Sequence, residues 1–197
     1  MPSVVLVDSG GTNIGSVRYA LERLGVDARL SADLGEIRAA THVILPGVGA
    51  AAPGMARLRE VGLVDVVRSL TQPVLGVCLG MQLLFEHSEE SDTTCLGLIP
   101  GSLRIFSKTR DLRVPHMGWN SLHPQRSSPL LNGIGDSAFA YFVHSYAAPI
   151  GDYTLASADY GGAFSAVVQQ RNFYGAQFHP ERSAAVGAKL LQNFIDL

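Results

Sequence analysis

The sequence has few of the features that mark secreted, membrane-bound or nucleic-acid-binding proteins. It contains only two cysteines, Cys78 and Cys95, which is too few for a disulfide-stapled scaffold and agrees with a reducing compartment. No apolar run reaches membrane-spanning length. The formal net charge is −2 and the basic residues are scattered, so neither nucleic acid nor an anionic membrane is an expected partner. The first positive side chain is Arg18, so we expect no signal peptide and a cytoplasmic protein.

The composition is that of a compact folded domain, with 47% hydrophobic and 16% charged residues in a chain of 197. In the first half, short apolar segments alternate with segments of helical periodicity. We expect strands over residues 3–8, 26–30, 41–45 and 73–77, with helices between them. This alternation predicts an α/β fold with a mostly parallel sheet flanked by helices. Ligand chemistry in such sheets lies beyond the carboxyl ends of the strands.

After Cys95 the pattern changes to strands separated by Gly, Pro and Asp turns. We expect strands over 102–107, 139–146, 153–158, 164–169 and 172–178, and then an amphipathic helix over 184–195. No linker-like composition separates the two halves. We therefore interpret these strands as an antiparallel extension of the same sheet, within a single domain over residues 1–197.

The strongest chemical signal is Gly76-Val77-Cys78-Leu79-Gly80, between an apolar strand and a helix expected over residues 79–86. It is the nucleophile-elbow pattern with cysteine in place of serine. The flanking glycines permit a sharp turn, and a cysteine at a helix N-terminus is favoured as thiolate. The alternative is that Cys78 is one more small buried hydrophobe, which is the usual fate of a free cysteine. The two glycines favour the nucleophile.

A thiolate nucleophile needs a base with its own orienting group, and His179-Pro180-Glu181 offers both. Proline favours an extended conformation for His179, and residues two apart in an extended segment project to the same side. Glu181 can then accept the N–H of the His179 ring, as the acid of a catalytic triad does. Taken by itself, a strand-end histidine bonded to a loop would be the better interpretation. Beside a cysteine elbow it becomes the weaker one.

A tetrahedral intermediate also needs donors for its oxyanion. The backbone N–H of Leu79 is the first candidate, and the Gly47-Val48-Gly49 loop is the second, although such a loop is by itself a weak signal. The cysteines and histidines lack the close spacing of metal ligands, so no metal is expected. The Gly10-Gly11 turn matches neither glycine-rich nucleotide motif, so no nucleotide cofactor is expected.

Together these residues resemble the class I (triad) glutamine amidotransferases, whose two signature segments match residues 76–82 and 178–181 in order and spacing. Pro115-His116-Met117-Gly118-Trp119-Asn120 and residues 141–146 are similar to the branch that forms the glutaminase subunit of imidazole glycerol phosphate synthase in histidine biosynthesis. The resemblance covers essentially the whole chain. It implies hydrolysis of glutamine to glutamate and ammonia. It also implies transfer of the ammonia to a (β/α)8-barrel cyclase subunit in a heterodimer, which then makes imidazole glycerol phosphate and aminoimidazole carboxamide ribotide.

The resemblance also implies a role for each matching residue. Cys78 would attack the substrate amide, assisted by His179 with Glu181 holding the ring. Gly47, Val48 and Leu79 would form the oxyanion hole, and Gln82, Tyr141, His144 and Ser145 would hold glutamine. Asn13, Met117, Trp119, Asn120 and Arg182 would face the partner. No cofactor is implied.

Some of these residues have plainer interpretations. His116 and His144 are, on general grounds, more often satisfied structural histidines, and Trp119 could pack in a core instead of an interface. In the first turn, Ser9 and Thr12 depart from the usual pattern of the branch, and Arg182 stands where lysine is common. These departures affect partner contact and leave the triad intact.

Two other functions fit an elbow cysteine. A free-standing γ-glutamyl hydrolase would be expected to carry secretion features and to act without a partner. A non-catalytic chaperone-like or regulatory protein would be expected to lack the His179 and Glu181 pair. The sequence favours the partner-dependent glutaminase over both.

Overall fold

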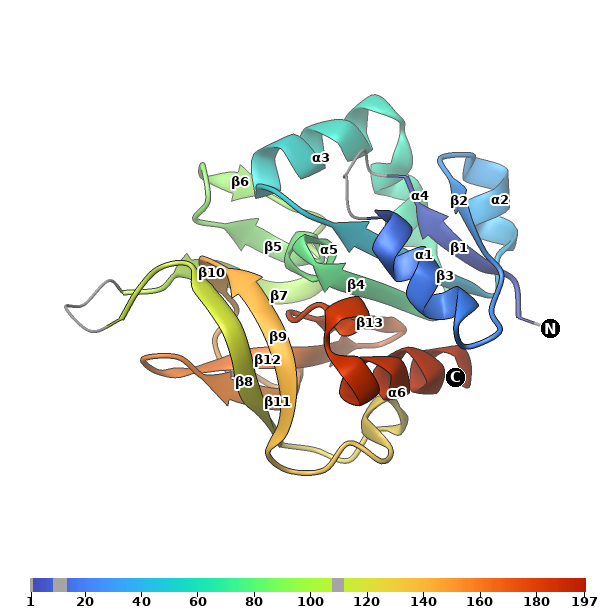
Figure 1. Cartoon of the computed structure of the whole chain (residues 1–197). Coiled ribbons are helices and arrows are strands. Elements are labelled where there is room, and N and C mark those ends of the chain that lie inside the picture. The colour runs from blue at the N-terminus through green and yellow to red at the C-terminus, as the bar shows by residue number, and fades with distance from the viewer. Residues whose placement is uncertain (1, 9–13, 108–111) are drawn as a thin grey trace.

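The structure, a computed structural model, describes residues 2–8, 14–107 and 112–197. Its centre is a nine-stranded sheet of order β2-β1-β3-β4-β13-β12-β11-β8-β9 (Figure 1). These strands are β1 (Val4–Val7), β2 (Ala28–Ser31), β3 (His42–Gly47), β4 (Val74–Cys78), β8 (His116–Pro124), β9 (Ala138–His144), β11 (Thr154–Asp159), β12 (Ala163–Gln170) and β13 (Phe173–Ala176). The mixed α/β architecture expected from the sequence is confirmed.

The half of the sheet from β2 to β13 is parallel and is covered by helices on both faces. Its inner strands β1, β3 and β4 are almost wholly buried because neither face meets water, whereas the edge strand β2 has two exposed residues. One face packs against α1 (Ile14–Glu22) and α6 (Ala184–Ile195). The other packs against α2 (Leu34–Ala39), α3 (Ala51–Glu60) and α4 (Leu63–Ser69). In the part of the chain that is described, no helix is long and apolar enough to cross a membrane.

The other half, from β12 to β9, is antiparallel, as expected. Strand β13 is the junction, because it is antiparallel to β12 and parallel to β4. The segment after Pro115 forms β8, a strand for which the sequence analysis had no prediction. Its residues alternate, with His116, Asn120 and Leu122 directed to the inner side and Met117 and Trp119 to the outer side.

The prediction that residues 102–107 extend the main sheet was wrong. They lie in β7 (Ile99–Ile105), which belongs to a separate four-stranded sheet of order β10-β7-β5-β6. The other members are β5 (Phe85–Ser88), β6 (Thr93–Thr94) and β10 (Tyr146–Ala147). Sequence patterns identify strands but not their neighbours, and β7 pairs in parallel with β5.

The helix expected over residues 79–86 is shorter than predicted. It is α5 (Leu79–Leu83), and the chain then turns into β5. Phe85 is fully buried and packs edge-on against Tyr153. This tertiary packing, with the pairing of β5 to β6 and β7, overrides the helical periodicity of the apolar residues. Two 3-10 turns, η1 (Pro129–Leu131) and η2 (Pro180–Arg182), complete the elements.

Candidate active site

Cys78 is the last residue of β4 and stands in a strained backbone conformation, with φ 52° and ψ −109°. A residue other than glycine is rarely found at positive φ, and such strain is concentrated at functional sites. The glycines permit the turn. A Cβ atom at Gly76 would lie 2.6 Å from main-chain atoms of Gly80 and Met81, and a Cβ at Gly80 would collide with the Leu45 carbonyl. The elbow therefore has the geometry of a nucleophile turn.

His179 and Glu181 lie beside this elbow because β13 runs parallel to β4, with Ala176 opposite Val77. The Nδ1 atom of His179 is 2.9 Å from Oε1 of Glu181. The two side chains are only 8% and 1% exposed, so this contact is shielded from water. The carboxylate keeps the proton on Nδ1 and leaves Nε2 for Cys78.

The electrostatics of His179 are dominated by its two acidic neighbours. Burial lowers the pKa of His179, but the hydrogen bonds and charges of Cys78 and Glu181 together outweigh burial and raise the pKa to about 10. The ring therefore holds a second proton at neutral pH. A protonated imidazole beside the sulfur stabilises a thiolate and can protonate a leaving amine.

A pocket of about 300 Å³ opens in front of the sulfur. It contains seven of the predicted site residues, and they are Val48, Cys78, Leu79, Gln82, His144, Ser145 and His179. Gly47 is placed next to Cys78 by the register of β3 and β4. The assignment of Gly47, Val48 and Leu79 to an oxyanion hole stays a prediction. A larger hollow of about 640 Å³ lies near Ser3 and Glu36, on the side of the protein away from Cys78.

Tyr141 is not among the residues that line this pocket. Its main chain instead secures the segment that follows β13. The Tyr141 carbonyl accepts from the His179 N–H at 2.9 Å, and the Tyr141 N–H donates to the Ser183 Oγ at 2.9 Å. Its ring lies on the outer face, where the Arg182 guanidinium stacks over it at 4.7 Å.

The sequence analysis missed three residues of the site, one that lines the pocket and two that approach the Cys78 sulfur. Glu90 lines the pocket and its carboxylate accepts from the Ala51 N–H at the start of α3. The Val143 carbonyl lies 3.8 Å from the Cys78 sulfur, and the Gln177 Nε2 lies 3.9 Å from it. Gln177 could have been found, because it stands two residues before His179 in an extended segment. Glu90 and Val143 carry no such signal.

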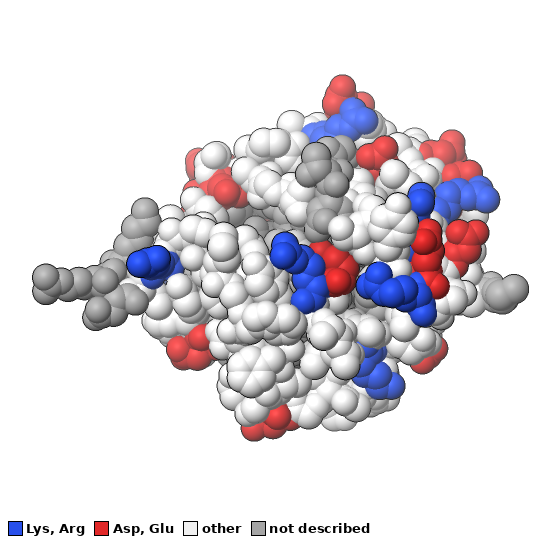
Figure 2. Space-filling view, viewed as in Figure 1, with Lys and Arg blue, Asp and Glu red and all other residues white. Residues whose placement is uncertain are grey.

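The predicted partner-facing residues do not all share one side of β8. Met117 and Trp119 are 63% and 53% exposed on its outer face. Phe139 on β9, which was not predicted, is 57% exposed on the same face. Figure 2 shows this part of the surface almost free of charge, with basic and acidic side chains at its border. Asn120 points to the inner side, and Asn13 lies outside the described residues.

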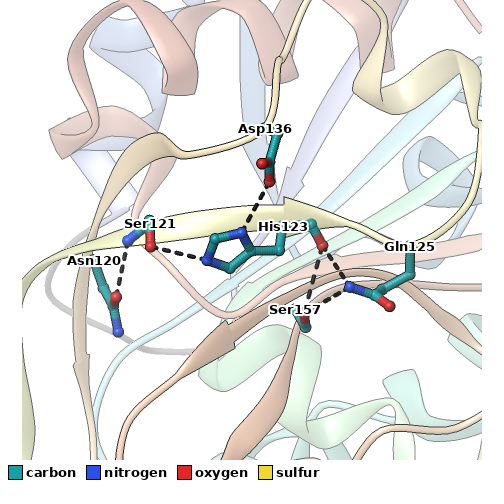
Figure 3. Close-up of polar contacts among 6 residues, drawn as sticks. All are labelled: Asn120, Ser121, His123, Gln125, Asp136 and Ser157. Atoms are coloured by element: carbon teal, nitrogen blue, oxygen red, sulfur yellow. Dashed lines mark hydrogen bonds and ion pairs between the residues drawn. The ribbon is translucent and has the colours of Figure 1, made fainter.

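A second series of hydroxyl, imidazole and carboxylate joins β8, which carries Ser121 and His123, to Asp136 in the turn before β9 (Figure 3). The Ser121 Oγ is 3.1 Å from His123 Nε2, and His123 Nδ1 is 2.9 Å from Asp136 Oδ1. The side chains of His123 and Asp136 are 41% and 74% exposed, so water competes for every contact. Ser121 sits in a regular strand pair and not at an elbow. We assign the candidate site to Cys78.

The part of the chain that the structure describes holds no cluster of three or more His, Cys, Asp or Glu side chains placed to bind a metal ion. A shielded cysteine at an elbow, a protonated imidazole and an orienting carboxylate fit acyl transfer.

Two buried histidines behind the pocket make the fold sensitive to acid. Burial lowers the pKa of His116 to about 4. Burial also lowers the pKa of His144, to about 3, helped by the charges of His116 and His179 and opposed by the Tyr146 carbonyl. The unfolded chain takes up protons near pH 6.5 while the folded chain does not, so stability is complete above about 6.5 and is lost as pH falls towards 4.

We expect His144→Asn to remove part of this acid sensitivity. The free energy of unfolding of the wild-type chain should fall by a few kcal/mol between about pH 7 and about pH 5, and by less in the variant. Urea unfolding at the two pH values measures the difference. Equal losses in both proteins would contradict the assignment of neutral, buried imidazoles.

Comparisons with known proteins bear on the family of the chain and on its fold. The sequence model of the family "Glutamine amidotransferase class-I" matches residues 5–197. The chain is 58% identical to the "Imidazole glycerol phosphate synthase subunit HisH" of Xanthomonas axonopodis pv. citri, over all of this chain and 98% of that protein. It is 55% identical to the subunit of the same name from Xylella fastidiosa strain Temecula1, with the same coverage.

Two solved structures share the fold. One is a crystal structure of a glutamine amidotransferase, with a TM-score of 0.76, 21% identity and 98% coverage of both chains. The other is PurLQS from Thermotoga maritima, with a TM-score of 0.70, 19% identity, and coverage of 100% of this chain and 99% of that one. At these identities the likeness speaks for the fold alone.

Proposed function

The chain belongs to the class-I glutamine amidotransferase family, and on this premise we propose that it is the glutaminase subunit of an imidazole glycerol phosphate synthase. Residues 1–197 would act as one glutamine amidotransferase domain in the cytoplasm. The observation that carries the proposal is that the elbow cysteine shares its pocket with a buried His179, whose Nδ1 atom lies 2.9 Å from Oε1 of Glu181.

The proposed chemistry runs in two halves. The Cys78 thiolate attacks the side-chain amide carbon of glutamine, and its former proton resides on His179. His179 then gives that proton to the amide nitrogen as the C–N bond breaks. Ammonia is released, and Cys78 is left carrying a glutamyl thioester. In the second half, water gives a proton to the neutral His179 and its oxygen attacks the thioester carbon. The C–S bond then breaks, which releases glutamate and restores the Cys78 thiolate beside a protonated His179.

The surroundings suit glutamine and its intermediates. The oxyanion of each tetrahedral intermediate would be met by N–H groups of Leu79 and the Gly47–Val48 loop, which lie next to the sulfur in the sheet register. The substrate ammonium would be attracted by the Glu90 carboxylate in the pocket. Both Nε2 hydrogens of Gln82 are already used by Tyr146 and Gln177, so its carbonyl oxygen is the group it can offer to the ammonium.

The partner would be a (β/α)8-barrel cyclase subunit, bound as a heterodimer on the outer face of β8 and β9. Met117, Trp119 and Phe139 give this face an apolar centre, and Arg182 stacked on Tyr141 gives it a polar border. The ammonia would pass to the cyclase, which would make imidazole glycerol phosphate and aminoimidazole carboxamide ribotide.

The proposal is tested by measuring glutamate release from glutamine by the chain alone, then with the cyclase subunit and its nucleotide ligand. We expect very low release alone and strong stimulation in the complex. Full activity without the cyclase would instead identify an independent amide hydrolase.

Trp119→Ala should weaken complex formation, since an aromatic side chain that becomes buried at an interface carries much of the free energy of binding. The control is Leu30→Ala, because Leu30 is an exposed apolar residue on β2 at the opposite edge of the sheet. This variant should leave the affinity for the cyclase unchanged.

A further inference from the structure

A series of five polar side chains runs from the inner side of β8 to the Cys78 sulfur, and the main-chain carbonyl of Tyr146 joins its two parts. Its members are Asn120, His116, His144, Gln82 and Gln177, which we call the polar series. All but Asn120 are buried, with exposures of 3% for His116, 6% for His144, 5% for Gln82 and 0% for Gln177. None belongs to the proposed triad. Buried polar groups are costly unless every hydrogen bond is made, so their arrangement is informative.

The contacts of the imidazoles link β8 to the main chain beside the pocket. The Asn120 Nδ2 lies 2.7 Å from the Asp159 carbonyl and 3.4 Å from His116 Nε2. His116 Nδ1 lies 3.1 Å from His144 Nε2. His144 Nδ1 lies 2.8 Å from the Tyr146 carbonyl. The two rings therefore form an unbroken bridge from Asn120 to Tyr146.

The two glutamines continue the series to the nucleophile. The Gln82 Nε2 donates to the Tyr146 carbonyl at 3.0 Å and to the Gln177 Oε1 at 3.0 Å. The Gln177 Nε2 then lies 3.9 Å from the Cys78 sulfur, a long contact that suits a sulfur acceptor. An N–H directed at the sulfur favours the charged thiolate over the thiol.

The Tyr146 carbonyl determines the tautomer of both imidazole rings and the orientation of the amide groups in the series. A carbonyl can only accept, so His144 must carry its proton on Nδ1 and Gln82 must present its NH2 group. A neutral His144 then accepts at Nε2, which requires His116 to donate from Nδ1 and to accept from Asn120 at Nε2. Protonation of His144 would bring two N–H groups face to face. The lowered pKa values of both rings, about 4 and about 3, agree with a pair that stays neutral.

Packing does not by itself require imidazoles here. The His116 ring stacks on Phe142 at 5.0 Å and on Tyr160 at 4.0 Å, and the His144 ring lies 5.1 Å from Phe164. Phenylalanine could occupy such an aromatic environment without polar atoms to satisfy. What the two histidines add is a donor of defined direction, held to the Tyr146 carbonyl.

We propose that His116 and His144 are positioning residues, which hold the Tyr146 carbonyl and thereby fix the Gln82 and Gln177 amides that donate to the Cys78 sulfur. This inference rests on the proposed function and assigns a role to residues outside its triad. The same strand, β8, directs Met117 and Trp119 outward and His116 inward.

The test replaces His116 in two ways that differ in one donor. In His116→Asn the amide nitrogen can take the position of Nδ1 and still donate to His144, whereas His116→Phe keeps the ring stacking and removes the donor. Two readouts are made in the complex with the cyclase subunit. They are the steady-state constants for glutamine, and the pH dependence of Cys78 alkylation by iodoacetamide.

We expect His116→Phe to lower kcat/KM roughly ten- to hundredfold, the equivalent of one hydrogen bond to a charged group, and to move the alkylation profile about one pH unit upward. His116→Asn should recover most of both. A lower melting temperature with an unchanged alkylation profile and kcat would show a merely structural role and overturn the inference. If His116→Phe does not fold, His116→Gln, which keeps only the Nε2 position, replaces it in the comparison with His116→Asn.

The two proposals fail in different ways. If the wild-type complex releases no glutamate while His116→Phe still shifts the alkylation profile, the proposed function is wrong and the positioning role stands. If the wild-type complex is active and the two His116 variants match it, the positioning role is wrong and the proposed function stands.

Discussion

Cys78→Ala will abolish glutamate release by the complex, with a fall of about 10³- to 10⁶-fold, because removing a triad nucleophile removes the covalent route altogether. The loss should appear in kcat, since the glutamine pocket and the partner face are unchanged. Binding to the cyclase should be retained, because Cys78 is buried and does not belong to the outer face of β8. Glutamate production at a comparable rate by the variant would refute the thioester mechanism.

Cys95 is the matched control for this experiment, since it is the other free cysteine. It is 1% exposed, and burial raises the pKa of its thiol to about 11. Its sulfur donates to the Thr93 carbonyl at 3.6 Å in a region without an elbow. Cys95→Ala should keep full glutaminase activity, and iodoacetamide should label the wild-type chain at Cys78 alone.

Gly80→Ala will prevent the elbow from forming, although it adds a single methyl group. The new Cβ would collide with the Leu45 carbonyl, which is main chain of β3 at the centre of the sheet and cannot rotate away. Overpacking against side chains costs about 1–3 kcal/mol, and a collision with sheet backbone should cost more. We expect urea unfolding to show a loss above about 3 kcal/mol or no folded protein, together with loss of the selective labelling of Cys78 over Cys95.

Gly135→Ala is the control for that substitution. A Cβ at Gly135 meets no atom within 4 Å, and its backbone does not need positive φ. This variant should unfold within about 0.5 kcal/mol of the wild type, as surface substitutions usually do. Similar stability of Gly80→Ala and wild type would show that the turn between β4 and α5 can relax, and that the strain at Cys78 does not depend on this close approach.

The local parts of the site could be predicted from the sequence because they are short-range. The elbow depends on Gly76, Cys78 and Gly80, and the carboxylate contact of His179 depends on a residue two positions away. The resemblance to class I glutamine amidotransferases rested on these same segments and is confirmed by the family match. Strand pairing was harder to predict from the sequence. The predictions for residues 102–107 and for the end of the helix at Leu83 were wrong because they depend on how β5 and β7 pair with other strands.

The sequence by itself determined the fold class and the kinds of group that could react, since hydrophobic periodicity, glycine spacing and a His-x-Glu pair are written in neighbouring residues. Only the tertiary structure decided which buried groups meet. The parallel pairing of β13 with β4 brings Gln177 and His179 to Cys78, about one hundred residues away in the chain. The β8–β9 pair likewise brings His116 to His144. Such contacts are set by sheet order and register, which depend on the packing of the whole core.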